Sequence, residues 1–403
     1  MTVSRKGFLK ALGFGLLASQ APRGWAAAAD KAEKSGAGKL RIKDVEIYAF
    51  DIPLKQPFRI SLGESTAAND VLVRIVTDAG LVGWGESSPF PPITGDTQGT
   101  NILMAKGIRE MIKGKDPLSV DAILNEIGHV VYSNPGIVAA FDMALLDIVG
   151  KAAGLPLFRL LGGDKGTFAS DITTGIDTPE KMAASAGANV ARGYKNIKIK
   201  VGLDPDEDTA RVRAVREAIG NGVHLRIDAN QGWTVPQAIH ALRQMEPFDV
   251  QFVEQPVVAW DIAGLKAVRN ESPIPVCADE AVFLPQDAMK LIKAEACDFF
   301  NIKLMKAGGV MNSVRIAHLA DAANLQCMVG CMLETRLALT AGAHVVGSQR
   351  NILFADLDGY TEHTLNPIVG GMSVSPSGEI TLPELPGLGV DVDPAFLKTL
   401  KRV

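Results

Sequence analysis

The sequence contains few cysteines, and no two of them form the C-x-x-C pair of a zinc knuckle. Each lies in or beside an apolar stretch typical of a strand, where cysteine behaves as a small hydrophobic residue. We therefore expect buried free thiols; if the protein is exported, a bridge between the last two is the alternative. The four are Cys277, Cys297, Cys327 and Cys331.

The sequence also lacks a block of basic residues and an apolar run long enough to cross a bilayer. The formal net charge is -4 at pH 7 and no basic block is present, which argues against a nucleic-acid surface. The apolar run Ala11–Ala18 is too short for a membrane anchor. These absences leave small polar molecules as the expected ligands.

Residues 1–29 are typical of a bacterial export signal. Basic residues come first, the short apolar run follows, and small residues suited to an A-x-A cleavage site lie between Ala26 and Ala29. The segment SRKGFLK resembles a twin-arginine motif, with Lys6 in place of the second arginine. We expect a periplasmic or exported protein, with a polar linker over residues 30–39. The alternative is an N-terminal extension on a cytoplasmic protein.

Three regions follow the linker. Residues 40–162 read as strands followed by helices, an α+β arrangement. Residues 163–364 contain eight short apolar strands, about 25 to 30 residues apart, with amphipathic helical segments between most of them. This alternation predicts an α/β fold, a (β/α)8-type barrel whose site lies at the C-terminal ends of the strands. Residues 365–403 carry Pro and Gly turns, and we expect them to pack back on the first region.

Carboxylates end three consecutive strands of the predicted barrel. Asp228 ends LRID, Glu254 ends QFVE and Asp279 follows VCA. Three carboxylates at one barrel mouth would repel one another unless a cation lay between them. An all-oxygen ligand set selects Mg²⁺, with Mn²⁺ as the alternative. Taken singly, each carboxylate could instead cap the next helix.

Lysines flank these carboxylates along the chain. In NIKIKVG, Lys198 and Lys200 are two residues apart on a predicted strand, so they share one face. Lys303 comes from the strand after Asp279. A substrate held on the cation would therefore have one amine on each side. The alternative is a strand end at which both ammonium groups of NIKIKVG reach solvent.

The motifs KIK, DANQGW, VEQP, ADE and NIKLMKAGG, in this order and spacing, resemble those of the enolase superfamily, specifically its muconate-lactonizing subgroup. GWGES, ITGDT and PGLGV extend the resemblance over nearly the whole mature chain. It implies a modified (β/α)7β barrel with an N-terminal capping domain that the C-terminal segment completes. It also implies that Lys200 and Lys303 are the acid/base catalysts, that Lys198 assists, and that the three carboxylates bind Mg²⁺.

The segment FADLDGY places Asp356 and Asp358 on one face at the end of the eighth strand. By the resemblance, such a pair holds the α-ammonium of the substrate in dipeptide epimerases; N-acylated and dicarboxylate substrates lack that group. With Lys200 on one face of the substrate and Lys303 on the other, the resemblance implies a 1,1-proton transfer. This transfer would invert the α-carbon of the C-terminal residue of an L-Ala-Xaa-type dipeptide. The alternative for the pair is hydrogen bonding to neighbouring loop amides.

Two further substrate contacts are weaker candidates, Thr173 on the first strand and Arg59 in PFRISLGESTAAND. In this family that segment is a mobile loop that contacts the substrate side chains. Members acting on L-Ala-D/L-Glu carry an arginine further along it, where this sequence has Gly63 and Glu64. The loop therefore favours a neutral or cationic second residue in the dipeptide.

Two other interpretations stay open. One is an N-acylamino acid racemase, o-succinylbenzoate synthase or muconate cycloisomerase of the same subgroup, against which Asp356 and Asp358 argue. The other is an inactive exported dipeptide-binding protein, against which the complete set of lysines and metal carboxylates argues. Because enolase-superfamily members are often oligomers, the resemblance also implies a homo-oligomer.

Overall fold

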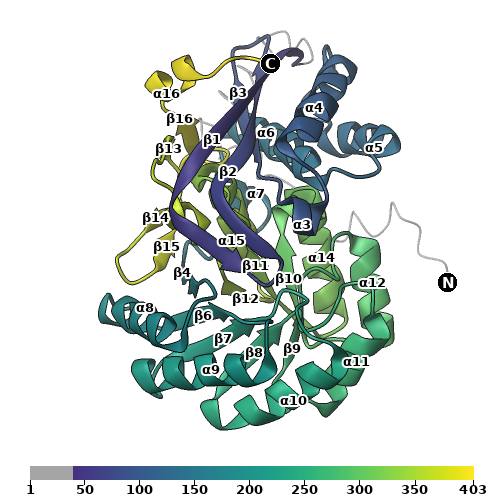
Figure 1. Cartoon of the computed structure of the whole chain (residues 1–403). Helices are drawn as coiled ribbons and strands as arrows, with labels where there is room; N and C mark the ends of the chain where they lie inside the picture. Colours follow the sequence, from purple (N-terminus) through teal and green to yellow (C-terminus); the bar gives the residue numbers. More distant parts are fainter. Residues whose placement is uncertain (1–39) are drawn as a thin grey trace, which may run out of the picture. The chain divides into compact units, whose positions relative to one another are not determined.

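The computed structural model describes residues 40–403 (Figure 1). The predicted export signal, residues 1–29, and the linker, residues 30–39, lie outside the described residues. Within the described part of the chain, no helix is both long and apolar enough to cross a membrane. All four cysteines are free thiols, so the bridge between Cys327 and Cys331 is absent.

The chain begins with an antiparallel sheet of three strands, β1 (Ile42–Ile60), β2 (Gly63–Thr77) and β3 (Val82–Ser87). The turn predicted at TDAG separates β2 from β3, and Gly80 adopts a φ of 81° there, which a glycine tolerates without strain. The segment expected to be a mobile loop is instead an extension of the β1–β2 hairpin, in which Arg59 pairs with Glu64.

Helices then cover one side of this sheet. The longest, α6 (Pro135–Ala153), begins at a proline and ends at Gly154, as its apolar spacing predicts. Gly83 and Gly85 of β3 lie directly against the main chain of α6, where a larger side chain would clash. The other helices of this region are α3 (Pro91–Thr94), α4 (Gln98–Ile112), α5 (Val120–Val130) and α7 (Leu157–Leu160).

Eight parallel strands form the second sheet, whose order follows the chain from first to last. Asp171 N donates to Ala355 O at 2.9 Å, which links the first strand to the last and closes the barrel. The strands are β5 (Ile172–Thr174), β6 (Asn196–Lys200), β7 (His224–Asp228), β8 (Val250–Glu254), β9 (Val276–Ala278), β10 (Phe299–Lys303), β11 (Gln326–Gly330) and β12 (Ile352–Ala355).

Helices follow seven of these strands, and the outer ring that they form is visible in Figure 1. The last strand leads only to a short 3-10 turn, η2 (Gly359–Glu362), so the barrel has the predicted (β/α)7β form. The helices are α8 (Pro179–Ala191), α9 (Pro205–Ile219), α10 (Val235–Met245), α11 (Ile262–Glu271), α12 (Pro285–Ala294), α13 (Leu304–Ala307), α14 (Val310–Ala322) and α15 (Arg336–Ser348).

The first predicted barrel strand, TFASDITTGI, is divided in the structure. Only its second half, β5, belongs to the barrel. Its first half, β4 (Thr167–Ala169), pairs antiparallel with β15 (Glu379–Thr381), which also pairs with β14 (Ser373–Val374). One continuous apolar stretch therefore serves two sheets.

The C-terminal segment returns to the first sheet. It contains β13 (Ile368–Gly370), β16 (Val390–Val392) and α16 (Pro394–Thr399). Trp84 Nε1 donates to Asp391 Oδ1 at 2.9 Å, and Val403 N donates to Ile47 O at 2.9 Å. These contacts agree with the packing expected for residues 365–403.

A buried carboxylate joins the first sheet to the barrel. Glu86 of β3 accepts hydrogen bonds from Thr335 N and Oγ1, both at 2.7 Å, and from Ala338 N at 3.0 Å. These donors lie at the N-terminus of α15, where a negative charge is favourable. Glu86 therefore fixes the loop between β11 and α15, which borders the barrel mouth.

Candidate active site

The three predicted metal ligands meet at the C-terminal end of the barrel. Asp228 and Glu254 are the last residues of β7 and β8 and pair in register, and Asp279 directly follows β9. All three are completely buried, and one oxygen of each lies within 4.8 Å of the others. The parallel register explains this convergence, because it brings the ends of adjacent strands to one edge.

The pKa values of these three carboxyls shift in different directions, upward for Glu254 and downward for Asp228 and Asp279. Burial raises the pKa of Glu254 to about 8, and the neighbouring charge of Asp228 adds to the effect. Burial also opposes ionisation of Asp279, but Lys303 and Lys306 outweigh it and lower the pKa of that carboxyl. Among the described residues, the Asp279 oxygens have ionic contacts with Lys303 and Lys306 but no hydrogen bond of good geometry. Buried carboxylate oxygens gathered at one point in this way fit a hard divalent cation.

Both lysines of NIKIKVG point into the barrel. The alternation of β6 sends Ile197 and Ile199 to the other face, where both are fully buried. Lys198 is completely buried and Lys200 is 7% exposed, which rules out a solvent-facing strand end. Lys200 Nζ lies 2.6 Å from Asp228 Oδ2.

Lys198 contacts three carboxylates at once. Its Nζ lies 2.7 Å from Glu254 Oε2, 2.8 Å from Asp356 Oδ2 and 3.1 Å from Asp228 Oδ2. Burial alone would lower its pKa, but these carboxylates outweigh burial and hold it above its usual value. Lys198 thus connects the three-carboxylate cluster to the residues after β12.

Lys303 lies on the other side of the cluster from Lys200 in the strand order. It is the last residue of β10, and its Nζ is 2.9 Å from Asp279 Oδ2. Burial lowers its pKa, but Asp279 and Glu254 have the larger combined effect and raise it. The strands between β6 and β10 carry the three carboxylates, so one lysine flanks them on each side.

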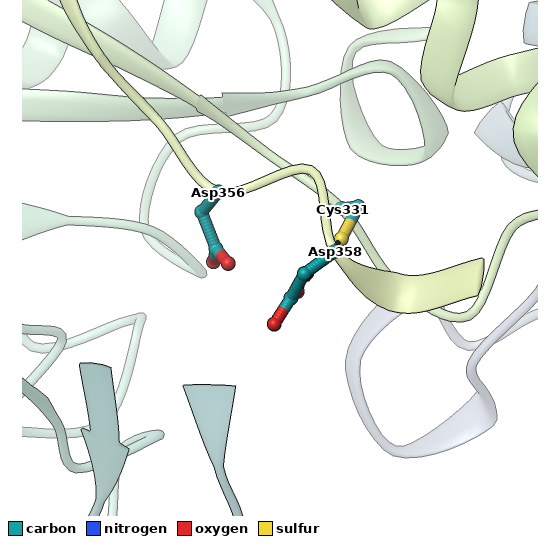
Figure 2. A group of neighbouring side chains, drawn as sticks. All are labelled: Cys331, Asp356 and Asp358. Carbon is teal, nitrogen blue, oxygen red and sulfur yellow. Dashed lines mark hydrogen bonds between the residues drawn. The ribbon is translucent and has the colours of Figure 1, made fainter. Parts of the chain in front are cut away.

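Asp356 and Asp358 follow β12 and extend in the same general direction, with Cys331 beside Asp358 (Figure 2). Their partners differ. Asp356 also accepts from Thr173 Oγ1 at 3.2 Å, whereas Asp358 accepts from the Thr173 main-chain N–H at 2.6 Å. The donor to Asp358 is an amide of strand β5 and not of a neighbouring loop, and Thr173 lies in contact with both carboxyls.

The two aspartates also differ in charge. Burial, and next the charge on Asp356, raise the pKa of Asp358 to about 7. Burial acts on Asp356 too, but Lys198 outweighs it and holds the pKa of Asp356 well below its usual range. Near neutral pH, Asp356 carries the firm negative charge, while Asp358 lies near its titration midpoint.

The main chain of Arg59 lies beside the segment that follows β5, where its carbonyl oxygen accepts from Ile176 N at 3.0 Å. Its side chain is exposed on the β1–β2 hairpin opposite Glu64, and its charge helps to lower the pKa of Asp177, whose main-chain contact with Thr178 has the largest effect. Within residues 40–403, no hydrogen bond or ion pair joins Arg59 to the lysines and carboxylates. The nearby hairpin residue that does reach the mouth is Ser61, whose Oγ donates to Asn230 O at 2.8 Å.

Sequence reasoning missed a fourth buried lysine at the barrel mouth. Lys306 is completely buried and pairs with the carboxylate of Asp279. It also donates to the main-chain oxygens of Asp279, Val282 and Asn301, the last two at 3.1 Å. The available signal was the second lysine of KLMK, three residues after Lys303. Lys306 thereby anchors the loop that carries one predicted metal ligand.

Two buried amides were also missed. Asn301 Nδ2 donates to Glu254 Oε1 at 2.7 Å, and Asn230 Nδ2 donates to Glu280 Oε1 at 3.0 Å. Burial raises the pKa of Glu280 to about 7, and the charge of Asp279 contributes. Both amides orient carboxyl groups around the cluster, a role that strand alternation does not reveal.

Comparison with protein families accounts for this arrangement. Residues 42–162 match the mandelate racemase/muconate lactonizing enzyme N-terminal domain, and residues 181–396 match the enolase C-terminal domain-like family. The chain belongs to the enolase superfamily. The superfamily predicted from KIK, DANQGW and the following motifs is confirmed, and the two matches cover the first sheet with its helices and the barrel from α8 onward.

Several similar proteins are dipeptide epimerases, and an N-succinyl-L-Arg/Lys racemase of Bacillus cereus is 34% identical over 90% of this chain and 98% of that protein. The L-Ala-D/L-Glu epimerase of Clostridium acetobutylicum is 41% identical over 87% of this chain and 98% of that protein. The hydrophobic dipeptide epimerase of Enterococcus faecalis is 39% identical, with coverage of 87% and 99%. The dipeptide epimerase of Cytophaga hutchinsonii, solved with Mg and D-Ala-L-Val, is 39% identical with a TM-score of 0.89, covering 90% of this chain and 99% of that one.

Proposed function

We propose that this protein is a dipeptide epimerase, an isomerase that inverts the α-carbon of the C-terminal residue of an L-Ala-Xaa-type dipeptide. The observation that carries the proposal is the pair of buried lysines, Lys200 on β6 and Lys303 on β10, on either side of three carboxylates. Similar proteins with dipeptide epimerase activity support it.

Asp228, Glu254 and Asp279 would hold Mg²⁺, with Mn²⁺ as the alternative. A divalent cation there would offset the negative charge that develops on the substrate carboxylate as the α-proton leaves. The support is the convergence of their oxygens within 4.8 Å and the complete burial of all three carboxylates. Lys306 and Asn301 would keep these ligands in place from outside the cluster.

Lys200 and Lys303 would carry the protons. The lysine facing the α-proton, in its neutral amine form, accepts it and becomes an ammonium; the other, an ammonium, donates a proton to the opposite face and becomes an amine. The bond to one α-hydrogen breaks and a bond to another forms, so the configuration inverts without net oxidation or loss of a group. Lys198 assists by holding Glu254 and Asp356 in position.

Asp356 and Asp358 would receive the α-ammonium of the substrate, and Thr173 would hold the two carboxyls in place. A firm negative charge on Asp356 suits a cationic group and opposes the dicarboxylates and N-acyl amino acids of the other subgroup reactions. For the second residue of the dipeptide, we propose that the site prefers a neutral or cationic side chain. The support is the acidic Glu64 on the hairpin, which lies opposite Arg59 in the strand pairing.

The test is proton NMR in D2O with Mg²⁺ and a set of L-Ala-L-Xaa dipeptides in which Xaa is acidic, apolar or basic. We expect loss of the C-terminal α-proton signal and appearance of the diastereomer, fastest for neutral or basic Xaa. A clear preference for Ala-Glu would overturn the side-chain assignment alone. Reaction of an N-succinyl amino acid, with every dipeptide inert, would overturn the epimerase proposal in favour of the racemase alternative.

Export remains a proposal that depends on residues 1–29. It would place the enzyme among peptides released outside the cytoplasm. Fractionation of a bacterial host should then recover a shortened protein in the periplasm. A full-length protein confined to the cytoplasm would contradict it.

A further inference from the structure

A buried aspartate outside the proposed catalytic set lies behind Asp356. Asp171 directly precedes β5 and is completely buried. Its Oδ2 accepts from Arg226 Nη1 at 2.8 Å, and its main-chain N–H closes the barrel against Ala355. Its other oxygen, Oδ1, has no hydrogen-bond donor among the described residues, and the neighbouring carboxyl of Asp356 is close enough to raise the pKa of Asp171.

The support behind Asp171 is rigid. The Arg226 guanidinium is also held by Gln251 Oε1 at 2.8 Å and stands over the rings of Phe354 and Phe252, 4.7 and 5.4 Å from their centroids. Cation–π contacts and a charge-assisted hydrogen bond together leave this side chain little freedom. The orientation of Asp171 is therefore set from the interior of the barrel.

Two carboxyl groups in contact inside a protein cannot both be ionised without a large penalty, so one of them keeps a proton. We propose that Asp171 is a positioning residue that directs the Asp356 carboxylate toward Lys198 and the substrate ammonium through a carboxyl–carboxylate hydrogen bond. The proton bridges the buried Oδ1 of Asp171 to Asp356. That arrangement gives this oxygen the partner that it otherwise lacks.

The pKa shifts of Asp171 and Asp356 have the directions that this hydrogen bond requires. Burial and then the Asp356 charge raise the pKa of Asp171 well above its usual value, whereas Lys198 outweighs burial at Asp356 and lowers its pKa. The proton therefore resides on Asp171, and the negative charge is kept on the carboxyl nearer the mouth. Asp171 determines where that charge lies without touching the substrate.

This inference rests on the proposed function for its catalytic consequence, since Asp356 binds an ammonium only if the substrate has one. A purely structural role is the competing explanation, in which Asp171 does no more than neutralise Arg226. The positioning role and the structural role predict different effects when Asp171 is replaced by an amide. An Asn side chain can accept from Arg226 and donate to Asp356, whereas an Ala side chain can do neither.

The experiment compares Asp171→Asn and Asp171→Ala with Asp147→Ala, a control that removes an equally buried carboxylate in α6, where Asp147 pairs with Lys151 at 2.7 Å. kcat and KM are measured by dipeptide α-proton exchange. Asp171→Ala should raise KM about tenfold or more, as loss of a hydrogen bond to a charged group does. Asp171→Asn should stay within about threefold of wild type, and Asp147→Ala should leave KM unchanged despite lower stability.

Infrared difference spectroscopy of wild type against Asp171→Asn near neutral pH gives a readout independent of turnover. A protonated carboxyl band present in wild type and lost in the variant is expected. Absence of that band would overturn the proposal, as would an unchanged KM in a folded Asp171→Ala protein. If wild type turns over no dipeptide, the proposed function fails by itself, and the infrared band still decides whether Asp171 carries the proton.

Discussion

A buried histidine makes the fold sensitive to acid in a predictable way. His344, on α15, is completely buried; its Nδ1 accepts from Phe158 N at 3.1 Å and its Nε2 lies 3.2 Å from Leu388 O. Both nitrogens are engaged by the neutral ring, because Nδ1 must stay unprotonated to accept. Burial accordingly lowers the pKa of His344 from 6.5 to about 4.

The direction of the pH dependence follows from the number of protons that the folded and the unfolded chain bind at His344. Between about pH 6.5 and 4 the unfolded chain binds a proton at this site and the folded chain does not, so the free energy of unfolding falls as the pH falls. The full difference is worth about 3 kcal/mol, of which about 2 kcal/mol is lost by pH 5. Above about pH 6.5 this contribution is fully present.

Urea unfolding of wild type and His344→Gln at pH 7.5 and pH 5 tests this magnitude. The variant should be less stable at pH 7.5, but its loss on acidification should be smaller than that of wild type by about 2 kcal/mol. His129→Gln, at an exposed position, is the control and should keep the wild-type pH dependence. Equal losses in wild type and His344→Gln would refute the reasoning.

Three further outcomes concern the metal, the ammonium and the loop after β9. Chelation with EDTA should abolish α-proton exchange while circular dichroism stays unchanged, and Mg²⁺ should restore it; exchange that persists would contradict the metal proposal. Asp358→Asn should raise KM for a free dipeptide about tenfold without changing the thermal midpoint, and an unaltered KM would count against ammonium binding there. Lys306→Met should lower the free energy of unfolding by about 1 to 3 kcal/mol in urea, because three buried carbonyl oxygens would lose their donor and Asp279 would keep only Lys303 as an ionic partner. The exposed Lys290→Met should be neutral, and equal stabilities would contradict the anchoring role.

The strand-end residues could be predicted because their positions follow from local rules. Alternation places Lys198 and Lys200 on the inner face of β6, and parallel order brings Asp228, Glu254 and Asp279 to one edge. Each of these inferences needs only the strand itself and the direction of its neighbours.

Other features depend on contacts between distant segments. The stretch before β5 joins a different sheet because Thr167–Ala169 meets Glu379–Thr381, more than two hundred residues later. The hairpin that extends β1 and β2 depends on cross-strand pairing through segments rich in polar and small residues. No periodicity within either segment encodes its partner.

Buried polar partners were the hardest to predict. The role of Asp171 depends on Arg226 on one side and Asp356 on the other, which are 55 and 185 residues away along the chain. Lys306 belongs to a short helix whose apolar neighbours give no sign that its ammonium faces three carbonyl oxygens. Such residues are identified only once the barrel has brought their partners together.

The most direct test of two-base epimerisation is NMR of α-proton exchange in D2O with separate L,L and L,D dipeptides, using Lys200→Met and Lys303→Met. Each variant keeps one proton carrier, so neither should interconvert the epimers. Each should still exchange the α-proton of one epimer, and the two variants should select opposite epimers. Interconversion by either variant, or exchange of the same epimer by both, would contradict the assignment of one lysine to each face.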